Sequence, residues 1–175
     1  MTWGIAYVIN NQNVQQKLHE ELDKVIGSDR LILVADRQQL HYTQAVIMEI
    51  QRVANIFAMN LPRKAAKDVV VNGCLIKGGT IVFPQISVIM QDPNVFKNPK
   101  EFNPDRYIDE NGQFVPVSRS RSFLAWTTSL FGRNNIFNQY KLLPGAKPPT
   151  LRKKGSGGSI ATEPYKVRVE RRRFN

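Results

Sequence analysis

A carboxylate and a guanidinium stand three residues apart in the stretch 42–52, and together they could form a buried ion pair. The stretch has no Gly or Pro, and apolar Val46, Ile50 and Val53 recur at helical spacing, which predicts an α-helix. At 100° per residue, several apolar side chains lie within about 60° of Glu49, so its carboxylate emerges in an apolar sector. A buried carboxylate without a partner costs several kcal/mol, and we therefore expect Arg52, on the same face, to pair with it. The more common exposed pair would contribute only about 0.3–0.5 kcal/mol.

A second arginine, Arg106, follows in Phe102-Asn103-Pro104-Asp105-Arg106-Tyr107, between aromatic residues and a turn set by proline. A helical Glu-x-x-Arg followed at this distance by Phe-x-Pro-x-Arg resembles the cytochrome P450 family of haem-thiolate monooxygenases, in its animal microsomal branch. Further motifs of the family occur in the same order: Leu40-x-Tyr42-x-x-Ala45, Leu61-Pro62-Arg63, Ile76-Lys77-Gly78-Gly79-Thr80, Gln91-Asp92-Pro93 and Phe96-x-x-Pro99.

The resemblance implies a mainly α fold with small β-sheets (α+β), of which this chain, residues 1–175, would be the C-terminal part. It implies a structural triad of Glu49, Arg52 and Arg106 behind the haem, and it places Arg63 where the family binds a haem propionate. Without the resemblance, a surface arginine would be an equally good interpretation of Arg63. The family inserts one oxygen of O₂ into lipophilic small molecules, takes electrons from a flavoprotein reductase, and resides at the endoplasmic reticulum membrane.

The resemblance breaks where the family supplies the cysteine thiolate that binds the haem iron. The only cysteine is Cys74, which precedes the Phe-x-Pro-x-Arg motif and lies in a stretch typical of a β-hairpin. An unrelated segment, residues 117–129, replaces the cysteine loop, and the acidic-Thr pair of the oxygen-activating helix is also missing. We therefore expect no catalytic residue and no metal ligand in this chain, no properly bound haem and no monooxygenase activity.

Composition leaves a second class of function open. The net charge is +11, and residues 150–175, which are expected to form a basic hairpin and tail, carry eight Lys or Arg and two Glu. This charge is typical of a solvated tail, and it also allows a non-catalytic splice-variant regulatory protein or a basic binding protein. No zinc spacing or helix-turn-helix pattern supports a specific nucleic-acid partner. No apolar run reaches the roughly 18–20 residues of a transmembrane segment, so we expect this chain to be anchorless.

The remaining elements can be predicted from local patterns. We expect helices near residues 3–9, 14–26 and 86–90, with Asn11 or Asn13 capping the second and Gly27 ending it. Residues 69–76 predict a hairpin around Asn72-Gly73, and residues 80–83 a strand. The family resemblance implies in addition a helix end over residues 136–144 and a terminal hairpin over residues 155–169. His19 is expected on the polar face of its helix as a solvated histidine, and His41 is expected to be structural.

Overall fold

The computed structural model describes residues 2–27, 30–55, 61–117, 135–152, 154–156 and 159–172. The helices and 3₁₀ turns are α1 Thr2–Asn10, α2 Gln12–Val25, η1 Val34–Gln39, α3 His41–Ala54, α4 Ile86–Met90, η2 Pro104–Tyr107 and α6 Asn135–Gln139. The strands are β1 Arg63–Lys64, β2 Val69–Val71, β3 Cys74–Ile76, β4 Ile81–Val82, β5 Tyr140–Pro144, β6 Lys154–Ser156, β7 Ser159–Ala161 and β8 Val167–Arg171. The predicted fold class, helices with small β-sheets, is confirmed.

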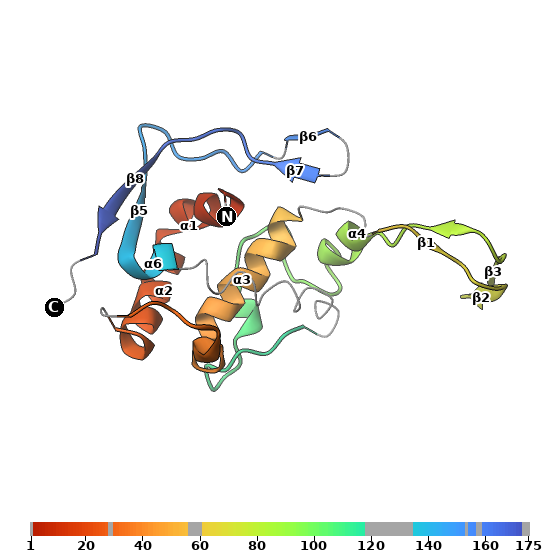
Figure 1. Cartoon of the computed structure of the whole chain (residues 1–175), viewed down its shortest axis with the longest axis horizontal. Helices are drawn as coiled ribbons and strands as arrows, with labels where there is room; N and C mark the ends of the chain where they lie inside the picture. Colours follow the sequence, from red (N-terminus) through yellow and green to blue (C-terminus); the bar gives the residue numbers. More distant parts are fainter. Residues whose placement is uncertain are drawn as a thin grey trace.

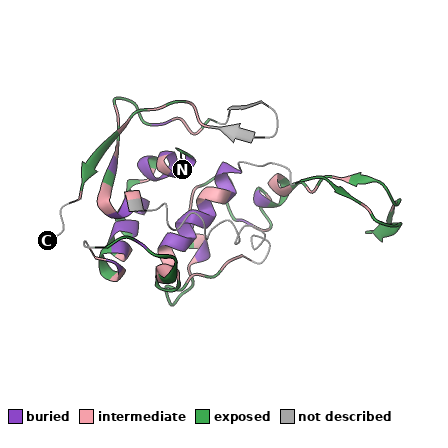
Figure 2. Ribbon diagram, in the orientation of Figure 1, coloured by how far each residue is buried: buried purple, intermediate pink, exposed green. Residues whose placement is uncertain are grey.

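Helix α3 is the centre of the helical body, and α1, α2 and η2 all contact it (Figure 1). Its buried face joins that of α2 in one apolar cluster, to which Leu18, Leu22 and Val46 contribute. A second cluster packs Ala45 and Met48 of α3 against loop residues. This two-sided packing explains why α3 is mostly purple in Figure 2, while the buried residues of α2 recur at helical spacing on one face.

Four two-stranded antiparallel sheets complete the described part of the chain: β1–β4, β2–β3, β5–β8 and β6–β7. The predicted hairpin is confirmed, since Asn72 (φ 49°) and Gly73 (φ 80°) both take the positive φ values of a tight turn between β2 and β3. Sheets β1–β4 and β2–β3 form an arm that extends away from the helical body (Figure 1). The expected helix at residues 86–90 is also present, as α4.

The helix end expected over residues 136–144 is wrong for its second half. The α6 helix stops at Gln139, and residues 140–144 form β5, which pairs with β8 in the register Tyr140↔Arg171 to Pro144↔Val167. Leu142 is fully buried and its backbone is bound by the Gln15 side chain, whose Nε2 donates to Leu142 O while Leu142 N donates to Gln15 Oε1. These partners are distant in sequence, so neither the local sequence nor the resemblance to a helix end could reveal the strand.

Part of the expected basic hairpin and tail forms a strand and an ion pair. Its strand β8 is paired, and Arg172 donates to Asn138 O at 2.9 Å and to the Asp23 carboxylate of α2. The expected cap of α2 also differs: Asn11 stands at the N-cap, but its side chain donates back to Tyr7 O instead of capping. Gly27, with φ 72°, ends this helix as expected.

Candidate functional site

The Glu49 carboxylate is the most completely buried charge in the described part of the chain, and it lies in the middle of α3. The exposed fractions of the side chains of Glu49, Arg52 and Arg106 are 0%, 1% and 10%. Arg52 lies one helical turn further on, and its Nε and Nη2 donate to the two Glu49 oxygens at 2.7 and 2.8 Å. This bidentate pairing matches the planar fork of arginine to the carboxylate.

Two further donors reach Glu49 from the loop that follows α4. Arg106 Nε, on η2, donates to Glu49 Oε1 at 3.1 Å, and the backbone N–H of Asn103 donates to the same oxygen at 2.9 Å. Asn103 itself caps η2 by accepting from Asp105 N, which fixes the turn that carries Arg106. The carboxylate thus joins the helix to a loop more than fifty residues away in sequence, and the structure brings the three residues of the expected triad together.

Backbone carbonyls satisfy the remaining donors of both arginines. Arg52 donates to the carbonyls of Met90, Pro99 and Glu101, at 2.9, 2.6 and 3.0 Å. Arg106 Nη1 donates to the Lys97 carbonyl at 2.8 Å. The triad contains two guanidinium groups and only one carboxylate. The negative ends of the carbonyl dipoles therefore stabilise the positive charge that Glu49 does not balance.

Glu49, Arg52 and Arg106 form a clamp whose polar groups are bonded to one another and to neighbouring backbone groups. Every oxygen of Glu49 is occupied, and Arg52 is closed off by the Phe96 ring, whose centroid lies 5.1 Å from Cζ. No side chain in the clamp is free to act as a nucleophile or to exchange a proton with a ligand. The clamp holds the segment 90–106 against α3.

Arg63, the expected haem-propionate residue, lies elsewhere. It is exposed on β1, where it pairs with Val82 of β4. Cys74 is exposed on β3 and faces Val71 across the hairpin, on the arm rather than in the helical body. In the part of the chain that the structure describes, no group of three His, Cys, Asp or Glu side chains could hold a metal ion. Arg63 and Cys74 thus both lie on the arm, apart from the Glu49 clamp.

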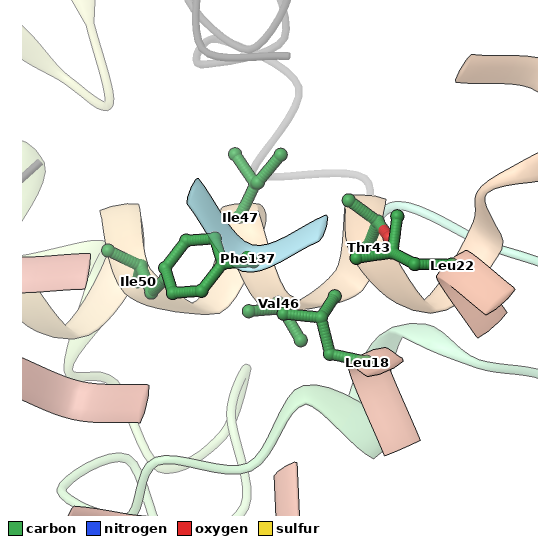
Figure 3. A pocket seen from close by; sticks show the side chains of 7 residues that line it. All are labelled: Leu18, Leu22, Thr43, Val46, Ile47, Ile50 and Phe137. Atoms are coloured by element: carbon green, nitrogen blue, oxygen red, sulfur yellow. The ribbon is translucent and has the colours of Figure 1, made fainter. Parts of the chain in front are cut away.

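The cavity shown in Figure 3 is too small for a cofactor or substrate. Its volume is about 10 Å³, which is no more than a water molecule needs, and its walls are apolar. The lining side chains come from α2, α3 and α6: Leu18, Leu22, Thr43, Val46, Ile47, Ile50 and Phe137. We treat it as a packing gap between helices.

The expectation that His19 is solvated is wrong. Its exposed fraction is 7%, and no hydrogen-bond partner reaches its Nε2. The pKa of His19 is lowered from 6.5 to about 4, mainly by burial and then by the nearby cations Arg172 and Lys141, against the opposing effect of Asp23. Residues of the late strand β5 and the residue that follows β8, namely Tyr140, Lys141 and Arg172, lie near His19, which the helix pattern alone could not show. His41 begins α3, and its Nδ1 accepts from the N–H of Phe114 at 3.3 Å, in keeping with a structural role.

Glu21 is a structural residue that sequence reasoning missed. Its carboxylate accepts hydrogen bonds from the N–H groups of Tyr42 and Thr43 at 2.6 and 2.7 Å and from the Thr43 hydroxyl at 2.7 Å. Residues 42 and 43 lie in the first turn of α3, where N–H groups have no intrahelical partner and the helix dipole favours an anion. Glu21 therefore caps α3, the helix that carries Glu49. In the sequence, the only sign of this role is that no capping residue stands directly before α3.

Among the described residues, no helix combines the length and the apolar character that crossing a bilayer requires. The segment 118–134, which contains nearly all of the expected replacement for the cysteine loop, lies outside the described residues.

Comparison with known proteins gives consistent matches to one family. The family model described as Cytochrome P450 matches residues 1–126. The chain is 40% identical to cytochrome P450 2A5 from Mus musculus over 114 residues, which are 65% of this chain and 23% of the relative. It is 36% identical to cytochrome P450 2U1 from Bos taurus over 115 residues, 66% of this chain and 21% of the relative.

A longer match, to cytochrome P450 2A7 from Homo sapiens, is 34% identical over 139 residues, 79% of this chain and 27% of the relative. The chain thus spans about a quarter of the length of the curated relatives that it matches. The family model covers α1 to η2, and with them the whole Glu49 clamp. The chain belongs to the cytochrome P450 family.

Proposed function

We propose that this chain provides part of the haem-side scaffold of a cytochrome P450 monooxygenase and corresponds to the C-terminal part of that domain. The buried Glu49–Arg52–Arg106 clamp is the observation that carries the proposal. A clamp that ties α3 to the segment 90–106 would hold the wall of a cofactor pocket in place without taking part in the reaction. The family match over residues 1–126 supports the same assignment.

In a complete enzyme of this type, the haem iron carries out oxygen insertion into a lipophilic small molecule, with electrons from a flavoprotein reductase. By this proposal the enzyme would work at the endoplasmic reticulum membrane. Arg63 would bind a haem propionate there, because a guanidinium is suited to a carboxylate and this one is exposed beside Lys64.

The 175-residue chain alone would be inactive. Thiolate ligation needs a cysteine at the face of the haem, and Cys74 lies on the arm, upstream of the Phe-x-Pro-x-Arg motif. The arm would have to detach and refold to bring Cys74 to the iron. We therefore propose that the chain retains the scaffold and lacks the catalytic centre.

A second candidate is a non-catalytic regulatory or basic binding protein. The exposed side chains of Arg168 and Arg171 on β8 favour it, since they present positive charge to solvent. Arg172 contributes less to such a surface, because its side chain is mostly buried and bonded to Asp23.

An absorption spectrum of the reduced protein with added haem and carbon monoxide tests the first proposal. We expect no thiolate-type spectrum from the parent chain, and none from the Cys74→Ser variant, which serves as the matched control. A weak histidine-type spectrum in both proteins would agree with adventitious binding. A thiolate spectrum that is present in the parent and lost in Cys74→Ser would show that Cys74 is a ligand and that the proposal is wrong.

A further inference from the structure

The sequence contains two Asn-Gly pairs, Asn72-Gly73 and Asn111-Gly112. Spontaneous deamidation is easiest at this dipeptide, because glycine has no side chain to shield its backbone nitrogen from the preceding side-chain amide. Both pairs lie in turns of the structure, and all four residues are exposed. Exposure therefore does not distinguish the two sites, and the difference between them lies in their hydrogen bonds and packing.

The first pair forms the turn between β2 and β3. Asn72 and Gly73 have φ angles of 49° and 80°, and Val71 pairs with Cys74 directly behind them. Within the described residues, neither the Gly73 N–H nor the Asn72 side-chain amide makes a hydrogen bond. The nitrogen that would attack and the amide that it would attack are thus both free, and only the conformation of the turn restrains them.

The hairpin that carries this turn has little support from the rest of the molecule. Figure 1 shows β2 and β3 at the end of the arm, away from the helical body, and Figure 2 shows the arm almost entirely green. All three residues of β2 are exposed, so neither of its faces is covered. Among the described elements, only β3 packs extensively on β2. An isolated two-stranded hairpin is marginally stable in water, so this turn opens easily to conformations that allow ring closure.

The second pair lies in a turn that is held by hydrogen bonds to Asp109. The Gly112 N–H donates to Asp109 O at 3.0 Å, and the N–H groups of Asn111 and Gln113 donate to Asp109 Oδ1 at 2.9 and 2.8 Å. The Asp109 N–H donates in turn to Gln113 O at 3.0 Å. The nitrogen that would attack the Asn111 amide is therefore already bonded, and the turn must lose this network before it can react.

The second turn is also anchored to the helical body. Ile108 and Phe114 form an antiparallel bridge on either side of it, and the Val115 N–H donates to Tyr107 O at 2.8 Å. Tyr107 is fully buried in the second apolar cluster, on which Ile108 and Phe114 also pack. Opening this turn therefore disturbs packing as well as hydrogen bonds, whereas opening the β2–β3 turn disturbs only its own hairpin.

We propose that Asn72 is a site of spontaneous deamidation in the folded chain, and that the Asp109 network protects Asn111. The Gly73 N–H gives its proton to a base from solvent, and its nitrogen attacks the Asn72 Cγ. The side-chain nitrogen of Asn72 leaves as ammonia, and a succinimide ring remains. Water opens the ring at either carbonyl, which yields aspartate or isoaspartate, and nothing is oxidised or reduced.

The two products affect the hairpin differently. Aspartate retains it, because Asp-Gly, like Asn-Gly, is typical of a turn with two positive φ values. Isoaspartate adds a methylene group to the main chain, so the turn loses the two-residue length that sets the register Val71↔Cys74. Residues 61–83 of the arm carry four cations and one anion, so either product lowers the net positive charge of the arm.

Incubation of the folded 175-residue chain at neutral pH, followed by trypsin digestion and mass spectrometry, tests the proposal. Cleavage after Lys and Arg places the two sites in separate peptides, residues 68–77 and 107–119, so one digest compares them. An isoaspartate-specific methyltransferase with a labelled methyl donor measures the isoaspartyl product. We expect deamidation at least about tenfold faster at Asn72 than at Asn111, since one hydrogen bond changes an opening equilibrium roughly fivefold. In concentrated urea, where both turns are lost, the two rates should become similar.

Three variants serve as controls. Asp109→Ala removes the oxygen that accepts from Asn111 and Gln113, and it should accelerate deamidation of Asn111 at least about fivefold. Asp109→Asn keeps an oxygen acceptor without the charge, and it should accelerate the reaction less than Asp109→Ala does. Asn72→Gly should remove the signal from the peptide 68–77 and keep the hairpin, because Gly-Gly also suits this turn.

Three results would overturn the proposal. Rates that are equal at the two sites in the folded chain, or faster at Asn111, would show that the free Gly73 nitrogen and the unsupported hairpin do not select Asn72. A tenfold difference that persists in urea would assign the selectivity to the local sequence. Equal acceleration by Asp109→Ala and Asp109→Asn would assign the protection of Asn111 to charge rather than to hydrogen bonds.

Discussion

Replacing Glu49 by alanine is expected to lower the free energy of unfolding by about 3–5 kcal/mol, because it leaves two guanidinium groups without their counter-charge. Arg52 is the more affected of the two, since its side chain is 1% exposed and cannot turn to solvent. The Asn103 N–H would lose its acceptor as well. Urea denaturation followed by circular dichroism measures the change.

Glu20→Ala provides the matched control for this experiment. Glu20 is exposed on α2, and its carboxylate accepts a hydrogen bond from the nearby Gln16. Its replacement should cost less than about 0.5 kcal/mol, as is usual for exposed polar groups. A loss below about 1 kcal/mol for Glu49→Ala would instead place Glu49 among surface ion pairs and would remove the physical basis of the clamp.

Acidification is expected to destabilise the chain through His19. The pKa of His19 is about 4 in the folded state, below its ordinary value of 6.5, so the unfolded chain binds a proton that the folded chain excludes. The contribution of neutral His19 to stability is therefore complete above pH 6.5 and is lost as the pH falls towards 4. A difference of one pKa unit corresponds to about 1.4 kcal/mol, so the loss in free energy of unfolding is on the order of 3 kcal/mol.

The His19→Gln variant isolates this contribution from that of the carboxylates. Urea denaturation at several pH values between 7 and 4 should show a steeper loss of stability in the parent than in the variant. Below pH 4 the two curves should become parallel again, because His19 is then protonated in both states. Parallel curves over the whole range would mean that His19 is solvated after all.

The centre of the fold could be predicted from sequence because its signals are local. The period of Val46, Ile50 and Val53 predicts α3, and the same period places Glu49 in an apolar sector where a buried pair with Arg52 is required. The Asn72-Gly73 turn predicts its hairpin because few other residues adopt its positive φ values. Arg106 could be associated with Glu49 only through the family motif, since no local rule joins residues so far apart.

What the sequence could not show depends on contacts made across long separations. His19 follows a buried leucine on its helix and is expected to be solvated, but Tyr140, Lys141 and Arg172 lie near it in the structure. Residues 140–144 resemble the end of a helix but form β5, because β8 offers a strand partner and Gln15 binds the Leu142 backbone. Glu21 caps a helix that begins twenty residues later, which helix-capping rules do not consider. In each case tertiary contacts override the local pattern.

A double-mutant cycle between Glu49 and Arg106 tests the central claim most directly, namely that one buried carboxylate holds the distant loop on α3. The cycle compares Glu49→Gln, Arg106→Met and the double variant by urea denaturation. We expect the coupling energy to be at least about 1 kcal/mol, as for groups in one buried network. If the two single changes add within about 0.3–0.5 kcal/mol, Glu49 and Arg106 are independent, and the clamp described here does not exist.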